Sequence, residues 1–211
     1  MMRLTLPPWC LAVLGLITLS LSHPALASFK DDVSGLYQSL HFEGEVSYPA
    51  FADAYRHFSQ PHSAKPVMTL IDYGKPSTEK RFWVINVKTR DVLFRSYVSH
   101  GKNSGNVYAK TFSNRVNSLQ TSLGIYRAAE TYHGKHGYSL RLDGLSEGLN
   151  DKARERAIVI HGADYANPAM IEQSGRLGRS WGCPALPTDL SSRVIDVIKN
   201  GTFIYAFSYQ A

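Results

Sequence analysis

The stretch Arg176–Pro187, with the sequence RLGRSWGCPALP, contains Cys183, the residue that is most informative about the fold and function of the chain. Cys183 directly follows Gly182 and precedes a proline, which is typical of a turn and not of a core strand. His161 lies 22 positions upstream, at the end of the short apolar run Ala157–Ile160. A cysteine in a glycine-flanked loop, with a histidine at a strand end, predicts a thiolate nucleophile and its base.

The chemistry of such a pair depends on its neighbours. A free thiol has a pKa of about 8.5, so only a few per cent of it is thiolate at neutral pH. An imidazole beside Cys183 can take the proton and pair with the sulfur. The Gly162 carbonyl can orient the other ring nitrogen of His161, and the backbone N–H groups of Gly182 and Cys183 can face an oxyanion. We therefore expect Cys183, His161, Gly162 and Gly182 to form the catalytic group.

The first 27 residues have the order of a secretory signal. Arg3 is the only basic residue before Lys30, an apolar run extends from Trp9 to Leu21, and Ala25–Ala27 offers small residues for cleavage. Residues 1–27 are therefore expected to be a signal peptide. The alternative is an uncleaved membrane anchor, although the apolar run is short for a span. No later segment is expected to cross a bilayer once the signal is cleaved.

Signal cleavage would leave Cys183 as the only cysteine, because Cys10 lies within the signal. A lone thiol in an oxidising compartment has no disulfide partner within the chain. It is either an inert core residue or a functional one, and the turn sequence around it favours function. The formal charge of +6 falls to about +5 without Arg3, a mild preference for anionic partners. Export argues against nucleic acid and favours an anionic polymer of the cell envelope.

The order of the predicted elements indicates one domain with an N-terminal addition. Helical periodicity predicts a helical segment over residues 28–66, followed by a β-rich domain over 67–211. Strands are expected at 67–73, 81–87, 91–99, 123–128, 138–142 and 202–207, with the second and third paired as a hairpin. Loops are expected at 100–105 and 133–137, and a helix at 187–200. This order predicts a mainly antiparallel β fold with flanking helices.

Other polar residues have two interpretations each. His133 and His136 have the spacing of a metal-binding pair, but their Gly-rich loop suits a cleft or solvent better, and no metal is expected. His100, in the stretch SHGKNSG, is either a loop residue or a substrate contact. Arg176 and Arg179 flank the cysteine loop and could bind a substrate carboxylate, and Arg176 could equally be a solvated loop charge. Arg141 is expected at the surface or in a cleft.

Two segments around the predicted nucleophile resemble a known family. Ile160-His161-Gly162 and Ser180-Trp181-Gly182-Cys183 resemble the signature of the murein L,D-transpeptidase catalytic domain (YkuD-type), a His followed by Ser/Thr-His-Gly-Cys. The resemblance runs from Arg81 to Phe207 and includes weaker matches at 97–102 and 121–126. Trp181 in place of the motif His, Ala185 in place of Asn or Arg, and a spacer of 18 residues mark a divergent branch.

The resemblance implies a YkuD-type fold and a two-step acyl transfer on peptidoglycan, without a cofactor. Cys183 would attack the third-residue carbonyl of a tetrapeptide stem and release D-Ala, with His161 protonating the leaving group. The acyl group would pass to an amine of a second stem, a lipoprotein or a free D-amino acid. The substrate would contact Arg179, Ser180, Trp181, Tyr138, Arg141 and His100. The resemblance also implies inhibition by carbapenems, and the expected signal peptide indicates a periplasmic or cell-envelope location.

Two other functions are compatible with this sequence. A hydrolase would resolve the same thioester with water, trimming stems or releasing cross-links, and the departures at Trp181 and Ala185 leave this open. A non-catalytic module would bind peptidoglycan with the same fold. The presence of both Cys183 and His161 argues against the second alternative.

Overall fold

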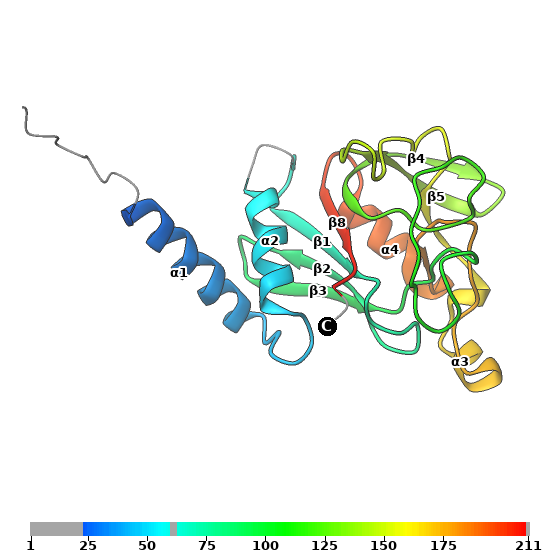
Figure 1. The fold of residues 1–211 in the computed structure, drawn as a ribbon, viewed down its shortest axis with the longest axis horizontal. Coiled ribbons are helices and arrows are strands. Elements are labelled where there is room, and N and C mark those ends of the chain that lie inside the picture. The colour runs from blue at the N-terminus through cyan, green and yellow to red at the C-terminus, as the bar shows by residue number, and fades with distance from the viewer. Residues whose placement is uncertain (1–22, 60–62, 210–211) are drawn as a thin grey trace, which may run out of the picture.

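The computed structural model describes residues 23–59 and 63–209 (Figure 1). Its centre is an eight-stranded sheet with the strand order β3-β2-β1-β8-β4-β5-β6-β7. The strands are β1 (Val67–Asp72), β2 (Phe82–Asn86), β3 (Asp91–Ser96), β4 (Gly124–Gly134), β5 (Gly137–Gly144), β6 (Val159–Gly162), β7 (Ala185–Leu186) and β8 (Phe203–Phe207). The helices are α1 (His23–Ser39), α2 (Tyr48–Phe58), the 3₁₀ turn η1 (Asp164–Ala166), α3 (Ala169–Ser174) and α4 (Thr188–Ile198).

The sheet curves so that its two ends approach each other. Neighbouring strands are antiparallel except β1 with β8 and β6 with β7, which are parallel. Beyond β3, Ser99 forms an isolated bridge to Ala185 of β7, and Gly101 forms one to Ser180. The segment that follows β3 therefore borders the cysteine loop, which places the predicted nucleophile where the two ends meet.

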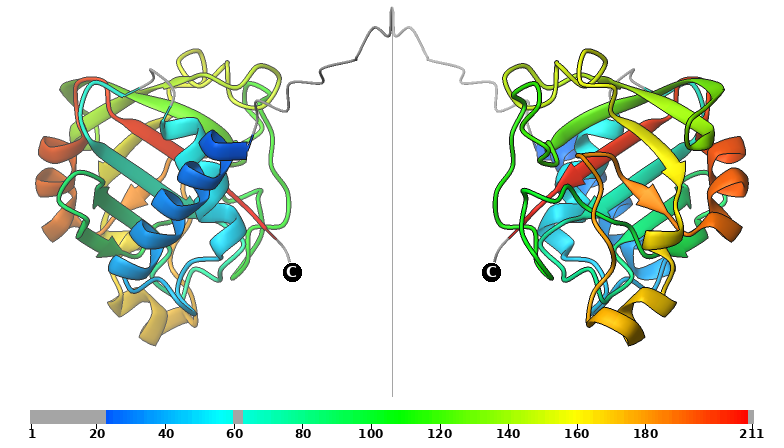
Figure 2. Two further views of the ribbon diagram at one scale, coloured as in Figure 1. Left: turned by 90° about the vertical axis from the view of Figure 1, so that its left-hand side faces the viewer. Right: turned by 90° about the vertical axis from the view of Figure 1, so that its right-hand side faces the viewer.

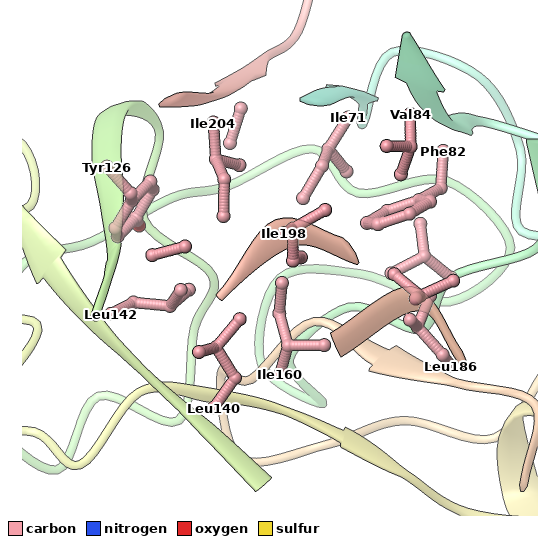
Figure 3. Packing of buried hydrophobic residues seen from close by; sticks show 14 of the residues in the cluster. Ile71, Phe82, Val84, Tyr126, Leu140, Leu142, Ile160, Leu186, Ile198 and Ile204 are labelled. Carbon is pink, nitrogen blue, oxygen red and sulfur yellow. The ribbon is translucent and has the colours of Figure 1, made fainter. Parts of the chain in front are cut away.

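Helices cover both faces of the middle strands. On one face, α1 and α2 pack against β1, β2 and β8 in a core that includes Phe42, Phe51 and Trp83. The left view of Figure 2 shows these two helices lying in front of the sheet. On the other face, α4 inserts Ile195 and Ile198 into a second core (Figure 3). Burial on both faces explains why β1 and β2 are continuous apolar runs rather than alternating ones.

Most elements predicted from the sequence are confirmed, and the differences have local causes. The fold is mainly β with flanking helices, the β2–β3 hairpin is present, and α4 and β8 match their predicted positions. The predicted loop at 133–137 is instead the tip of a long hairpin, because Gly134 pairs with Gly137 across a two-residue turn. The short elements η1 and α3 were not predicted. They fall within the spacer between His161 and Cys183.

Most of the predicted signal peptide lies outside the described residues and stays a prediction. Helix α1 begins at His23 and continues through Ser28, the expected first residue after cleavage. Over residues 23–59 and 63–209, no helix combines the length and the apolar character needed to cross a bilayer.

Candidate active site

The predicted nucleophile and base are brought together by the pairing of β6 with β7. His161 is directly opposite Ala185 in this parallel pair. Cys183, two residues before Ala185, consequently lies beside Val159, two residues before His161. Cys183 and His161 both line one cavity of about 390 Å³. Two residues far apart in the sequence therefore share one cavity.

The thiol of Cys183 is held by the backbone of the residues that lead into β6. The Val159 N–H donates to Sγ at 3.5 Å, and the thiol donates to the Ala157 carbonyl at 3.7 Å. Burial raises the pKa of Cys183, while the Val159 N–H and the Arg156 charge oppose that shift. The resting sulfur is therefore a protonated thiol at neutral pH.

The ring of His161 is fixed by its own strand end. Its Nδ1–H donates to the Gly162 carbonyl at 2.9 Å, the contact expected from the sequence, and this leaves Nε2 as the basic nitrogen. The residue is only 1% exposed. Burial lowers the pKa of His161, and the neighbouring His136 lowers it further. Its neutral form is therefore favoured at pH 7, as a general base requires.

No hydrogen bond joins Cys183 to His161 within the described part of the chain. The ion pair expected from the sequence is thus not the resting state, since the thiol pKa is raised and the imidazole pKa is lowered. The thiol donates to the Ala157 carbonyl, so its proton must turn away from this carbonyl before His161 can accept it. Catalytic hydrogen bonds are often long in free enzymes and shorten when substrate binds.

The predicted oxyanion site needs a correction at Gly182. The Gly182 N–H donates to Ser180 Oγ at 3.0 Å, and Ser180 Oγ in turn donates to the Cys183 carbonyl at 2.6 Å. This N–H therefore does not face the cavity, and the Cys183 N–H is the remaining member of the predicted pair. Gly182 has φ +126°, and a Cβ there would meet the Gln120 carbonyl oxygen at 2.8 Å. The role of Gly182 is to shape the turn.

The cavity carries positive charge. Its lining contains the basic side chains of Lys135, Arg156 and Arg179, and it contains no carboxylate. The full lining is Tyr132, Lys135, His136, Arg156, Ala157, Val159, His161, Tyr165, Arg179, Ser180, Trp181 and Cys183. A cavity of this composition favours an anionic ligand.

Three of the predicted substrate contacts, Arg179, Ser180 and Trp181, line this cavity. Arg179 donates from Nη1 to the carbonyls of Lys102 and Gly105, at 3.2 and 2.9 Å, which ties it to the neighbouring loop. Trp181 is 70% exposed, with Lys102 Nζ 5.6 Å from its ring centroid. An exposed tryptophan two residues from the thiol is a candidate contact surface for a ligand.

His100 is not at the cavity, so its prediction as a substrate contact is wrong. It is 1% exposed, and its Nδ1 accepts from Nη2 of the fully buried Arg81 at 2.8 Å. Burial and the Arg81 charge lower the pKa of His100 to about 3. It is a neutral core residue. The sequence stretch around it has loop character, but long-range packing buries it.

Tyr138 and Arg141 are also separated from the cavity. The Tyr138 hydroxyl donates to Asp196 at 2.9 Å, so this ring faces α4 rather than a ligand. Arg141 forms an ion pair with Glu130 at 3.3 Å and lies 4.3 Å from the Tyr132 ring centroid. Arg141 therefore contacts a cavity residue from outside and does not line the cavity itself.

Several lining residues were missed or left open by the sequence analysis. His136 lines the cavity, as its cleft interpretation expected, and its ring stacks on His161 at 4.3 Å. Lys135 comes from the same hairpin tip. The flanking glycines Gly134 and Gly137 are the signal that could have predicted this tight turn. Because β5 pairs with β6, the turn reaches over the predicted base. Tyr165 and Arg156 had no such signal.

The described residues contain no group of three or more His, Cys, Asp or Glu side chains arranged to hold a metal ion. His133, the other member of the predicted pair, stacks on Tyr138 with ring centroids 5.2 Å apart. The two histidines of the H-x-x-H spacing therefore face different neighbours.

Comparison with known proteins gives a match at the level of the family. The sequence profile described as the L,D-transpeptidase catalytic domain matches residues 43–207, most of the chain. No curated protein sequence matches.

Solved structures similar to this chain include several L,D-transpeptidases. The enzyme from Mycobacterium smegmatis is 17% identical with a TM-score of 0.41, over 67% of this chain and 58% of that one. L,D-transpeptidase 1 from Mycobacterium tuberculosis is 16% identical with a TM-score of 0.38, over 67% and 61%. The domain from Xylanimonas cellulosilytica is 16% identical with a TM-score of 0.38, over 70% and 63%. This chain thus spans less than two thirds of each of these structures. On the profile match, the chain belongs to the L,D-transpeptidase catalytic domain family.

Proposed function

We propose that this protein is a peptidoglycan L,D-transpeptidase with Cys183 as nucleophile and His161 as general base. The observation that carries the proposal is the shared cavity. Cys183 and His161 line it together, and the Gly162 carbonyl holds the histidine in the tautomer that leaves Nε2 basic. Family membership supplies the reaction class.

The first step forms a thioester. His161 takes the thiol proton, and Sγ attacks the carbonyl carbon of the third residue in a tetrapeptide stem. The bond from this carbon to the D-Ala nitrogen then breaks, and the proton held by His161 passes to the departing amine. The Cys183 N–H is the backbone donor that would stabilise the intermediate oxyanion.

The second step breaks the thioester. An acceptor amine attacks the same carbonyl carbon, the C–S bond breaks, and the sulfur recovers a proton by way of His161. The acceptor is an amine of a second stem, of a lipoprotein or of a free D-amino acid. The basic lining of the cavity supports a substrate that carries carboxylates, as peptide stems do. Residues 1–27 would direct the protein to the periplasm or cell envelope, where this polymer is found.

Product analysis tests the reaction directly. The protein is incubated with a disaccharide-tetrapeptide, with and without a free D-amino acid other than alanine. We expect release of D-Ala and exchange of the added amino acid into position four. Release of D-Ala with only the tripeptide as product would assign a hydrolase. No release, with equal binding of wild type and Cys183→Ala to peptidoglycan sacculi, would leave a binding module.

Trp181 is predicted to contact the substrate beyond the reacting bond. Its ring is exposed on the cavity rim, where an apolar or sugar face can stack on it. Trp181→Ala should reduce the acylation rate by the disaccharide-tetrapeptide about 5- to 10-fold, as expected for an aromatic contact of about 1 kcal/mol. Acylation by a carbapenem, a smaller ligand, should change less. Trp181→Phe is the matched control and should retain most of the rate; an equal loss with both ligands would contradict this role.

A further inference from the structure

The guanidinium of Arg156 donates four hydrogen bonds, and all four acceptors are neutral. Its Nη1 donates to the Ser113 carbonyl at 2.7 Å and to Ser122 Oγ at 3.1 Å. Its Nη2 donates to the Gln120 carbonyl at 2.5 Å and to Ser118 Oγ at 3.2 Å. The guanidinium therefore spans the loop 113–122, which we call the strap, and holds it against the cysteine loop.

The charge of Arg156 has no carboxylate partner in the described part of the chain. Its four acceptors are carbonyl and hydroxyl oxygens, and no acidic side chain lines the cavity. The neighbouring Arg154 differs, because it forms ion pairs with Glu130 and Asp143, each at 2.6 Å. Arg156 is thus a half-buried cation whose charge is not neutralised locally, and burial lowers its pKa.

This charge lies beside the turn that carries the nucleophile. Arg156 Nη2 is 3.3 Å from the position that a Cβ on Gly182 would occupy, and Gly182 is adjacent to Cys183. The strap carbonyl of Gln120 packs against the same glycine. Arg156 and Cys183 also line the same cavity. A negative charge on Sγ would therefore form close to the guanidinium, where screening by solvent is reduced.

We infer that Arg156 is a positioning residue for the nucleophile: it supplies the charge that stabilises the Cys183 thiolate while its hydrogen bonds hold the strap. The inference rests on the proposed function only in that Cys183 is taken as the nucleophile. Other titratable groups line the same cavity or lie against the neighbouring turn, and all of them are basic or phenolic. They are Lys135, His136, His161 and Arg179 in the cavity lining, Tyr132 and Tyr165 beside them, and Tyr73 and Tyr126 beneath the turn.

Among these groups, Arg156 is distinguished by its fixed geometry. Lys135 and His136 lie on an exposed hairpin tip. During the pH titration of the thiol, His161 has already lost its proton because its pKa is lowered, so it contributes no fixed charge. Arg179 is turned toward the carbonyls of Lys102 and Gly105. Removing the Arg156 charge should therefore shift the ionisation of the thiol more than removing any one of the others.

The test is the pH dependence of Cys183 alkylation by iodoacetamide, followed by mass spectrometry on the tryptic peptide that contains Cys183. Alkylation reports the thiolate fraction and requires no acyl transfer. Arg156→Gln should raise the midpoint of the alkylation profile by about 1 pH unit, and thus reduce the rate near pH 7.5 about 10-fold. Arg156→Lys keeps the charge and should remain close to wild type. Arg154→Gln is the matched control and should not shift the midpoint.

A wild-type midpoint in Arg156→Gln would overturn the inference. So would an equal upward shift in Arg156→Lys, because the hydrogen-bonded strap would then be the cause. If Arg156→Gln does not fold, the alkylation midpoint is measured in Arg156→Lys and Ser122→Ala instead. Both variants keep the positive charge at position 156, so a raised midpoint in both would contradict a role for that charge. Failure of the proposed function is seen separately, as the absence of D-Ala release by wild type, and leaves the alkylation profile interpretable.

Discussion

Replacing His161 with glutamine should reduce the rate at which a disaccharide-tetrapeptide or a carbapenem acylates Cys183 by about 100- to 10,000-fold at neutral pH. The reason is the pair of shifted pKa values. Burial raises the thiol pKa of Cys183, so little thiolate exists without a base. Burial lowers the pKa of His161, so its Nε2 is free to accept the proton. Glutamine fills part of the same volume but cannot take up a proton at this pH.

The pH profile of acylation gives this prediction a second readout. In wild type the rate should increase with pH as His161 loses its proton, at a pH below the ordinary histidine value of about 6.5. In His161→Gln this acidic limb should be absent, and the rate should follow only the thiol, above its ordinary pKa. His133→Gln is the control, since His133 stacks on Tyr138 and does not line the cavity. An unchanged rate and profile in His161→Gln would remove His161 from the mechanism.

The second large effect concerns stability in acid and originates at His100. Folding lowers the pKa of His100 from about 6.5 to about 3, so the unfolded chain binds a proton that the folded chain does not. The stabilisation is therefore complete above pH 6.5 and is lost as the pH falls toward 3. At pH 4.5, about 2 pH units below the unfolded value, this residue alone should reduce the free energy of unfolding by about 3 kcal/mol.

Urea unfolding at pH 7.5 and 4.5 measures this effect. In His100→Gln the loss of stability between the two pH values should be smaller than in wild type by about 3 kcal/mol. The glutamine side-chain oxygen can still accept from Arg81, the partner of Nδ1 in wild type. His133→Gln, at an exposed position, should behave as wild type. Equal pH dependence in wild type and His100→Gln would mean that His100 is not the buried neutral group described here.

The sequence correctly predicted those strands and helices whose hydrophobic pattern matches their burial in the fold. The apolar run of β1 and the periodicity of α4 both reflect burial, which the residue types report directly. The two residues of the motif also met as predicted, because Cys183 and His161 lie on neighbouring chain segments of one sheet. The first two predictions depended on patterns within a few residues, and the third on two motif segments of the sequence taken together.

The predictions that were wrong depended on contacts between distant segments. His100 lies in a stretch with loop character, and only the packing of Arg81 makes it a core residue. Tyr138 lies on a strand beside the site, but its hydroxyl is bound to Asp196 of α4. Arg156 was not predicted at all, because it belongs to no motif and its hydrogen bonds reach a strap that begins 43 residues earlier in the chain. Such contacts require the topology, which local periodicity does not provide.

The most direct test of the account is intact-protein mass spectrometry of wild type and Cys183→Ala after incubation with a disaccharide-tetrapeptide and, separately, with a carbapenem. We expect a covalent mass gain in wild type with each ligand, located on the peptide that contains Cys183, and no gain in the variant. With the muropeptide, the gain should equal the ligand mass minus one D-Ala. Absence of any adduct on wild type, with the protein folded and still bound to sacculi, would contradict the assignment of Cys183 as a nucleophile.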